Sequence, residues 1–352
     1  MAGTLKQPKT ILVRCPNWVG DLVMATPFFD SLKKNFPEAR LIGLMRKRLG
    51  QVLRDSPWFD QIIEVNDKTS RGFIHTIRLI RSLSPDMGIL LPNSIRSTLE
   101  MWLGGTRDIY GYRRGGRTPF LTGGPQPIRE GWKIIPLPMV EYYSKICLSM
   151  GLGLPEDMKP LLFFSESVHN KCDRLLKKYG INPGDLVIGL NPGARFGSSK
   201  CWPPGHFAAL AELFEETFHC KLLLLVGPGE DALAEAIVEQ THAHIANTAA
   251  DKIESDQITP LIQRCQLLVT NDTGPRHYAV AFDVPVVVIM GPTDPRYTAS
   301  NLEKTSVLRH DVDCSPCHKK VCPRDHVCMR EITPAMVLEA GKQLMVDRIT
   351  RV

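Results

Sequence analysis

Short apolar runs alternate along the chain with longer segments in which apolar side chains recur every three or four positions. The short runs predict buried strands, and the longer segments predict helices. The expected strands cover residues 10–14, 40–45, 61–65, 87–91, 186–190, 221–226, 266–270 and 285–290, and the expected helices cover 20–36, 73–83, 141–150, 205–218, 231–240 and 258–264. Because strands alternate with helices, we predict parallel sheets that are covered on both faces.

The alternation runs twice, on either side of a Gly- and Pro-containing stretch at residues 151–160. A chain of 352 residues has the length of two domains of ordinary size. We therefore predict an α/β protein with two Rossmann-like domains, residues 1–160 and 161–330, whose parallel sheets face each other across a cleft. Residues 331–352 are expected to form a C-terminal helix that can pack back on the first domain.

Composition points to a cytoplasmic protein. No apolar run approaches the ~20 residues of a membrane span, and the polar, basic residues 1–10 do not have the pattern of a signal peptide. Most of the ten cysteines are scattered in apolar contexts, as is typical of a protein kept reduced.

Charge is distributed unevenly along the chain. Residues 1–150 hold 22 Lys and Arg against 12 Asp and Glu, whereas the remainder holds 21 against 25. The first half is therefore expected to attract anions such as acidic saccharides, phosphates or a membrane surface. The alternative is that these charges only solvate an outer face.

Three turns of the second predicted sheet carry chemistry, and each follows a strand. Small residues and two cations follow the first strand, carboxylates the second, and a polar helix start the third; the candidates are Arg195, Lys200, Glu230, Asp231, Asp272, Thr273, Gly274 and His277. Cations and free N–H groups at a helix start suit phosphates, and a carboxylate suits ribose hydroxyls. Together the turns predict a nucleotide diphosphate site. Helix capping by Asp231 or Asp272 and solvated surface cations are the competing interpretations.

The first strand-to-helix turn places Asp21 at the start of a helix. The turn lacks the G-x-G-x-x-G pattern, and no G-x-x-x-x-G-K-[ST] is present in the chain, which argues against NAD, FAD and P-loop chemistry. Asp21 either caps its helix or serves as a general base at the sheet edge where α/β folds place ligands.

Four cysteines near the end of the chain, Cys314, Cys317, Cys322 and Cys328, have the spacing C-x2-C-x4-C-x5-C. Four thiols so close together can hold a structural zinc ion, or they can be free or oxidisable thiols. We expect no catalytic role for them.

Five sequence segments together resemble the lipopolysaccharide heptosyltransferases of glycosyltransferase family 9, most closely its type II members. They are Pro16–Asp21, Leu91–Ser94, Gly111–Arg114, Asn191–Ala194 with Lys200–Pro203, and Asn271–Gly274 with His277. The resemblance implies a GT-B fold with the donor site in the C-terminal domain. It also implies an inverting, metal-independent transfer from ADP-L-glycero-D-manno-heptose to the first heptose of the lipopolysaccharide inner core, with no cofactor required.

The resemblance also implies roles for individual residues. Asp21 matches the proposed catalytic base, Lys200 matches the phosphate-binding lysine, and Glu230 or Asp231 matches the acidic residue near the adenosine ribose. Asp272, Thr273, Gly274 and His277 match the donor motif D-T-G-x-x-H.

The implied acceptor is an inner core of the heptosyl-Kdo2-lipid A type at the cytoplasmic face of the inner membrane. Arg113, Arg114 and Arg117, in a basic segment expected to form a loop, are candidates to hold its carboxylates and phosphates, together with Asn93. A family 9 enzyme with another acceptor and a nucleotide-sugar epimerase on the same scaffold are alternatives. A nucleic-acid-binding module is not favoured, because the basic segments lack interleaved aromatic residues.

Overall fold

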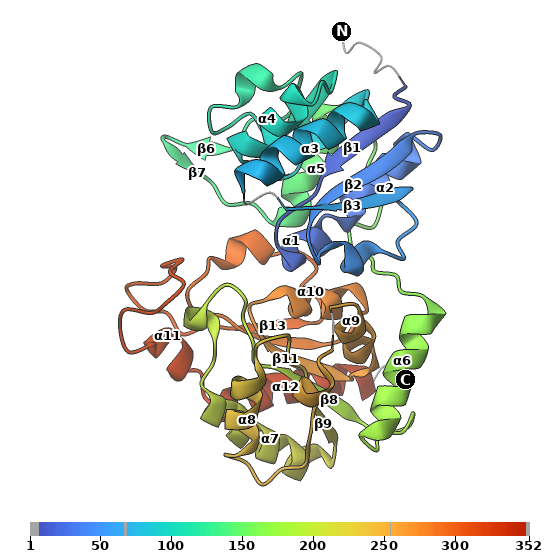
Figure 1. The fold of residues 1–352 in the computed structure, drawn as a ribbon. Helices are drawn as coiled ribbons and strands as arrows, with labels where there is room; N and C mark the ends of the chain where they lie inside the picture. Colours follow the sequence, from blue (N-terminus) through green and yellow to red (C-terminus); the bar gives the residue numbers. More distant parts are fainter. Residues whose placement is uncertain (1–6, 67–68, 254, 350–352) are drawn as a thin grey trace. The chain divides into compact units, whose positions relative to one another are not determined.

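The computed structural model describes residues 7–66, 69–253 and 255–349 (Figure 1). The chain forms two units. Unit 1 contains residues 1–163 and 296–300, and unit 2 contains residues 164–295 and 301–352. Within the described ranges, no helix is both long and apolar enough to cross a bilayer.

Unit 1 is built on a five-stranded parallel sheet. Its strands are β1 (Thr10–Arg14), β2 (Arg40–Arg46), β3 (Gln61–Val65), β4 (Met87–Leu90) and β5 (Asp108–Gly111), and a small hairpin is formed by β6 (Arg129–Glu130) and β7 (Lys133–Ile134). Its helices are α1 (Val19–Met24), α2 (Thr26–Asn35), α3 (Ser70–Leu83), α4 (Ile95–Leu103) and α5 (Met139–Ser149), with the short 3-10 turns η1 (Gly50–Leu53) and η2 (Thr118–Phe120). Helices α2 and α5 pack together, and α3 packs with α4.

Unit 2 repeats this architecture with six parallel strands. They are β8 (Val187–Asn191), β9 (Lys221–Leu224), β10 (Ile245–Asn247), β11 (Leu267–Asn271), β12 (Val286–Ile289) and β13 (Thr305–Leu308). The helices are α6 (Glu166–Lys178), α7 (Pro204–Phe218), α8 (Asp231–Val238), α9 (Ser255–Arg264), α10 (Gly274–Ala281), α11 (Val327–Arg330) and α12 (Pro334–Ile349), with the turns η3 (Ser198–Lys200) and η4 (Thr248–Asp251).

The strand order of each sheet reverses at its centre. The order is β3-β2-β1-β4-β5 in unit 1 and β10-β9-β8-β11-β12-β13 in unit 2. The loops after β1 and β4 therefore diverge from one point of the first sheet, and the loops after β8 and β11 diverge from one point of the second. Open α/β sheets bind ligands outside the carboxyl ends of the strands at such a switch point.

The predicted α/β class with parallel sheets is confirmed, and two local expectations are corrected. The segment 20–36 is two helices that meet at Ala25, because Pro27 sits in the first turn of the second one. The basic segment 107–124 begins with β5 rather than being loop throughout. Helix α12 packs within unit 2 against α7 and the strands β11–β13, and the predicted packing on the N-terminal domain stays a prediction.

Three helices, α4, α6 and the four-residue α11, were not predicted. Helix α4 is short, but its cap was visible in the sequence: the Ser94 hydroxyl accepts a hydrogen bond from Ser97 N at 3.2 Å. In α6 the buried Val168, Cys172, Leu175 and Leu176 follow the helical period behind Ser165, a usual cap residue.

Candidate functional site

Buried polar side chains fasten the strand ends at the switch point of unit 2. The Asn191 amide donates to Leu225 O at 2.7 Å and accepts from the Thr270 hydroxyl at 3.0 Å, so it joins the ends of β8 and β11 to the residue after β9. Asn271 donates to Pro192 O at 2.6 Å and accepts from Trp202 N at 3.1 Å. These bonds fix the loop 192–202 against the end of β11. This role of the two asparagines was not predicted, although both residues end apolar runs.

Asp272 binds two cations at this point. Its Oδ2 lies 2.6 Å from Lys200 Nζ and accepts from the Thr293 hydroxyl at 2.6 Å, while its Oδ1 lies 2.9 Å from Arg276 Nη1. Lys200 also donates to the main-chain oxygen of Asp272 at 2.7 Å. Burial alone would raise the pKa of Asp272, but the two cations and the hydrogen bonds hold it well below its ordinary value. Two cations against one carboxylate leave a net positive charge in a nearly buried cluster.

Helix α10 begins beside this cluster. Thr273 is its N-cap residue in an extended conformation, and Pro275 lies in the first turn. The N–H groups of a first helical turn have no helical acceptor and favour an anion. The predicted Thr273–Gly274 anion site and the predicted Lys200 site are therefore at one place. Asp272 precedes the cap residue, and its carboxylate pairs with the two cations, so it does not cap the helix.

His277 is buried one turn into α10, with 7% of its surface exposed. Burial, assisted by the Arg276 charge, lowers the pKa of His277 to about 3. The imidazole is therefore neutral at pH 7 and can offer a hydrogen bond, but not a charge, to a ligand.

Glu230, in the turn after β9, lies against Gly193, in the turn after β8. Its Oε2 accepts from Gly227 N at 2.7 Å, and a Cβ at Gly193 would lie 2.0 Å from its Oε1, so a side chain at position 193 would displace the Glu230 carboxylate. Burial raises the pKa of Glu230, opposed by the Gly227 hydrogen bond. Asp231 is exposed in the first turn of α8, and Arg195 is exposed in the loop after β8.

The cysteine segment 314–328 packs against the loop that carries Lys200. Ser199 N donates to Lys320 O at 3.1 Å, the Ser199 hydroxyl donates to Lys319 O, and the His326 ring lies 2.6 Å from Ser199 O. A Cβ at Gly197 would lie 2.2 Å from Lys320 O. The cysteine segment thus holds the loop that carries Lys200 through main-chain contacts at Ser199. The sequence alone did not indicate these contacts.

The four cysteines of this segment line one cavity of about 80 Å³. Burial and the nearby thiols of Cys322, Cys314 and Cys317 raise the pKa of Cys328. All ten cysteines are free thiols, and in the described part of the chain no three His, Cys, Asp or Glu side chains are grouped as metal ligands. The zinc hypothesis stays a prediction.

At the switch point of unit 1, Asp21 lies in the first turn of α1 and is half-buried. Its charge reaches the buried Tyr143, whose pKa is raised well above the ordinary value by burial and then by Asp21. Asn93 follows β4, the other strand of this switch point.

Arg117 is placed differently from the prediction, because it is fully buried. Its guanidinium donates to Pro92 O at 2.5 Å, to Tyr112 O at 2.9 Å and to the Asn93 side chain at 3.0 Å. Arg117 therefore holds the loop after β4 instead of facing an acceptor, and the Asn93 oxygen is occupied by it and by Tyr142. Arg113 is exposed and Arg114 is half-buried, and their acceptor role stays a prediction.

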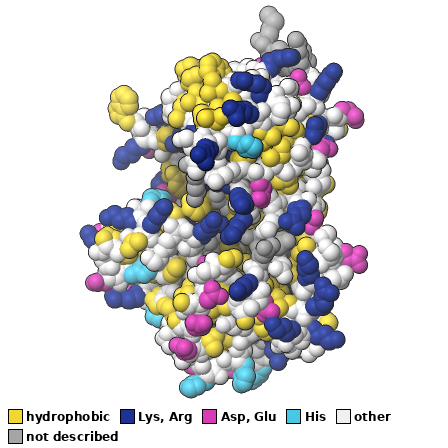
Figure 2. Space-filling model, viewed as in Figure 1, with side chains coloured by type: hydrophobic (Ala, Val, Ile, Leu, Met, Phe, Trp, Pro, Cys, Tyr) yellow, Lys and Arg dark blue, Asp and Glu magenta, His cyan; other side chains and the backbone are white. Residues whose placement is uncertain are grey.

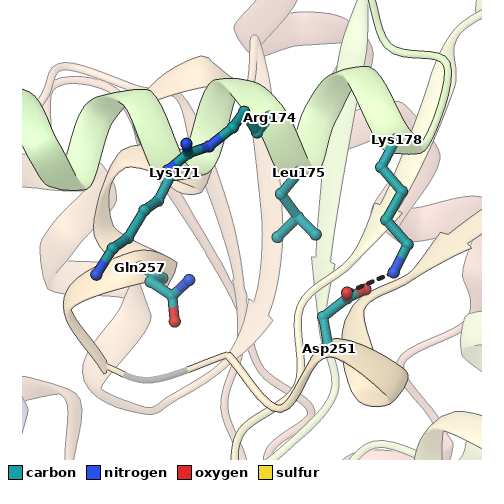
Figure 3. Close-up of a pocket in the computed structure, with 6 residues that line it drawn as sticks. All are labelled: Lys171, Arg174, Leu175, Lys178, Asp251 and Gln257. Carbon is teal, nitrogen blue, oxygen red and sulfur yellow. Dashed lines mark hydrogen bonds and ion pairs between the residues drawn. The ribbon is translucent and has the colours of Figure 1, made fainter.

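A second cavity of about 300 Å³ lies on α6, away from the predicted residues (Figure 3). Lys171, Arg174 and Lys178 of α6 line it together with Asp251 and Gln257, and Lys178 pairs with Asp251. None of the predicted donor residues lines this cavity.

The two Rossmann-like units, each with a strand order that reverses at its centre, have the architecture of the GT-B fold. The profile of glycosyltransferase family 9 (heptosyltransferase) matches residues 75–328. The chain belongs to this family.

Relatives of known name cover nearly the whole chain. The chain is 28% identical to lipopolysaccharide heptosyltransferase 2 of Escherichia coli K12 over 96% of its own length and 99% of that protein. It is 27% identical to lipooligosaccharide heptosyltransferase 2 of Campylobacter jejuni, over 95% and 98% of the two chains. The solved E. coli ADP-heptose lps heptosyltransferase II has a TM-score of 0.77 and 26% identity, over 96% and 99% of the two chains. The predicted family, fold class and enzyme class are confirmed.

The buried His277 predicts a pH dependence of stability. Its pKa is about 3 in the folded chain against 6.5 ordinarily, so the unfolded chain takes up a proton first as the pH falls. Between pH 6.5 and pH 5 this group should lower the free energy of unfolding by up to about 1.4 kcal/mol per pH unit. Urea unfolding of the ligand-free protein should show a shallower pH dependence in His277→Gln. The exposed His244→Gln is the matched control, and equal slopes for His277→Gln and wild type would contradict the assignment.

The cysteine cavity generates a second prediction. If the thiolates hold zinc, protein purified without chelator should contain about one zinc ion per chain, and Cys317→Ser should lose it. Elemental analysis measures this. Zinc-free protein in which all ten thiols titrate after denaturation would support the free-thiol interpretation instead.

Proposed function

We propose that the protein transfers an L-glycero-D-manno-heptosyl group from ADP-heptose to the first heptose of a lipopolysaccharide inner core. The observation that carries the proposal is the cationic cluster of Lys200, Asp272 and Arg276 beside the start of α10. Relatives named lipopolysaccharide or lipooligosaccharide heptosyltransferase 2 support this donor and acceptor. The reaction would take place in the cytoplasm, at the inner membrane.

The donor's diphosphate would lie against Lys200 and the first turn of α10. As the bond between the anomeric carbon and the diphosphate breaks, negative charge develops on the departing ADP. The net positive cluster and the helix N–H groups would stabilise this charge without a metal ion. Glu230 would accept hydrogen bonds from the adenosine ribose, because its carboxylate lies against Gly193 while Asp231 points to solvent.

Asp21 would act as the general base on the acceptor side. The acceptor hydroxyl is a poor nucleophile, so its proton must pass to a carboxylate while its oxygen forms the bond to the anomeric carbon. Attack from the face opposite the leaving ADP inverts the configuration. Arg113 and Arg114 would bind the acceptor's anionic groups, and Arg117 would hold the loop that contains Asn93.

Incubation with ADP-heptose and a panel of truncated cores tests the function. We expect a mass gain of one heptose on a core that ends in a single heptose, with release of ADP. A changed sugar nucleotide with donor alone would instead indicate an epimerase. Linkage analysis of the product separates type II transfer from another family 9 acceptor.

Lys200→Ala should weaken ADP binding at least tenfold by calorimetry and lower turnover with it, because it removes the charge aimed at the phosphates. Asp272 keeps its Arg276 and Thr293 partners in this variant, which limits the structural damage. The exposed Lys221→Ala is the control. Unchanged ADP affinity would remove Lys200 from the phosphate site.

Asp21→Asn should lower turnover by about 10²–10⁴-fold, the range typical for loss of a general base. ADP affinity should stay at the wild-type value, because the donor residues lie in unit 2. The exposed Glu38→Gln serves as the charge-matched control. Turnover retained in Asp21→Asn would discard the base assignment.

A further inference from the structure

Exposed hydrophobic side chains of unit 1 include a group on the helix pair α3–α4 and one at the end of the hairpin β6–β7, besides residues elsewhere such as Trp18 and Leu148. Trp132 is 96% exposed at the hairpin turn, next to Gly131. On α4, Trp102 is 51% exposed, and Ile95 and Leu103 are exposed as well. Figure 2 shows hydrophobic side chains gathered where Figure 1 has α4, and a hydrophobic projection where it has the end of the hairpin. Such a set is more than the scattered apolar residues of an ordinary surface.

The fold holds the Trp102 ring and the backbone of the turn that carries Trp132. The Trp102 ring lies edge-on against Phe120 of η2, with 5.2 Å between the ring centroids. Arg129 donates to Trp132 O at 3.3 Å, which closes the hairpin turn. The Trp102 indole is therefore packed on one side and exposed on the other, whereas the Trp132 indole projects into solvent from a closed turn.

Positive charge surrounds these apolar groups. Helix α3 carries Arg71, Arg78 and Arg81, all exposed, and its sequence contains no acidic residue. The one carboxylate of α4, Glu100, is buried and paired with Arg96 at 3.4 Å. Arg81 also donates to Leu103 O at 2.9 Å, which joins the cations of α3 to the apolar end of α4. At the hairpin, Glu130 offsets only one of the two cations Arg129 and Lys133.

We infer that this basic aromatic face, formed by Arg78, Arg81, Ile95, Trp102, Leu103 and Trp132, binds the surface of an anionic phospholipid bilayer. Indole rings favour the headgroup region of a bilayer, and Arg side chains bind its anionic phosphates. A rigid protein partner would need a complementary surface of about 800 Å². Trp132 instead projects alone from a two-residue turn. A single projecting side chain can insert into the headgroup region of a bilayer.

The inference rests on the proposed function, because the proposed acceptor is anchored in a membrane by its lipid. It specifies which surface of unit 1 meets that membrane. It is independent of the donor chemistry, since none of the residues of the basic aromatic face belongs to the proposed catalytic or donor site.

Co-sedimentation of the full chain with phosphatidylcholine vesicles, with and without phosphatidylglycerol, tests the inference without any substrate. The wild-type protein should bind the anionic vesicles, and less so as salt increases. The double variant Trp102→Ser/Trp132→Ser should lose at least tenfold in binding, and Arg78→Glu should lose most of the dependence on phosphatidylglycerol. Leu148→Ser, exposed on α5 outside the face, should bind as wild type. Circular dichroism checks that each variant is folded.

Failure of wild type to bind anionic vesicles, or wild-type binding by the double variant, would overturn the inference. Self-association that depends on the two tryptophans, seen by analytical ultracentrifugation, would reassign the face to a second copy of the chain. In the transfer assay, the double variant should match wild type on a detergent-dispersed acceptor and fall at least fivefold on an acceptor embedded in vesicles. If wild type does not transfer heptose at all but still binds vesicles, the proposed function fails and the surface assignment stands.

Discussion

The ion pairs of Asp272 are the constraint on which the donor half of the molecule depends. One nearly buried carboxylate holds a lysine from the turn after β8 and an arginine from α10. Breaking such a pair by removing one partner leaves an uncompensated buried charge, which is strongly unfavourable. The loop after β8 and the helix after β11 are thereby fixed to each other at the switch point. The two cations exceed the one carboxylate in charge, so the cluster can also attract an anionic ligand. The same contacts therefore fix the loop and leave a positive charge beside it.

A buried cation also fixes the loops at the switch point of unit 1. Arg117 is buried and holds Pro92, Asn93 and Tyr112 by main-chain and side-chain hydrogen bonds. It shapes the turn after β4, beside the turn that carries Asp21. In each unit, a buried cation thus holds the loops at the switch point of the sheet. The two sites differ in exposure, because Lys200 in unit 2 is partly exposed whereas Arg117 in unit 1 is fully buried.

The sequence predicted those parts of the fold and site that depend on local pattern. Eight of the strands are apolar runs, and parallel strands end at one sheet edge, so Lys200, Glu230 and Asp272 could be expected together. What it could not show depends on contacts between distant residues. Arg117 has the same composition cues as Arg113, yet the tertiary fold buries one and exposes the other. Helix α4 was missed because nine residues give little periodicity, and the contact of Ser199 with Lys320 spans too much chain for any local signal.

The contact of Ser199 with the segment that contains Lys320 affects the order in which parts of the chain can fold during synthesis. The partners of Ser199 lie 120 and 127 residues further along the chain, at Lys319 and His326. A chain growing on a ribosome can pair β8 with β9 long before residues 319–326 have been made. The contacts of Ser199 with this segment therefore form only when synthesis is nearly finished, after Asn271 and Asp272 can already hold the loop. A nascent chain should form the strand pairs of its second sheet first and the outer contacts of the Lys200 loop last.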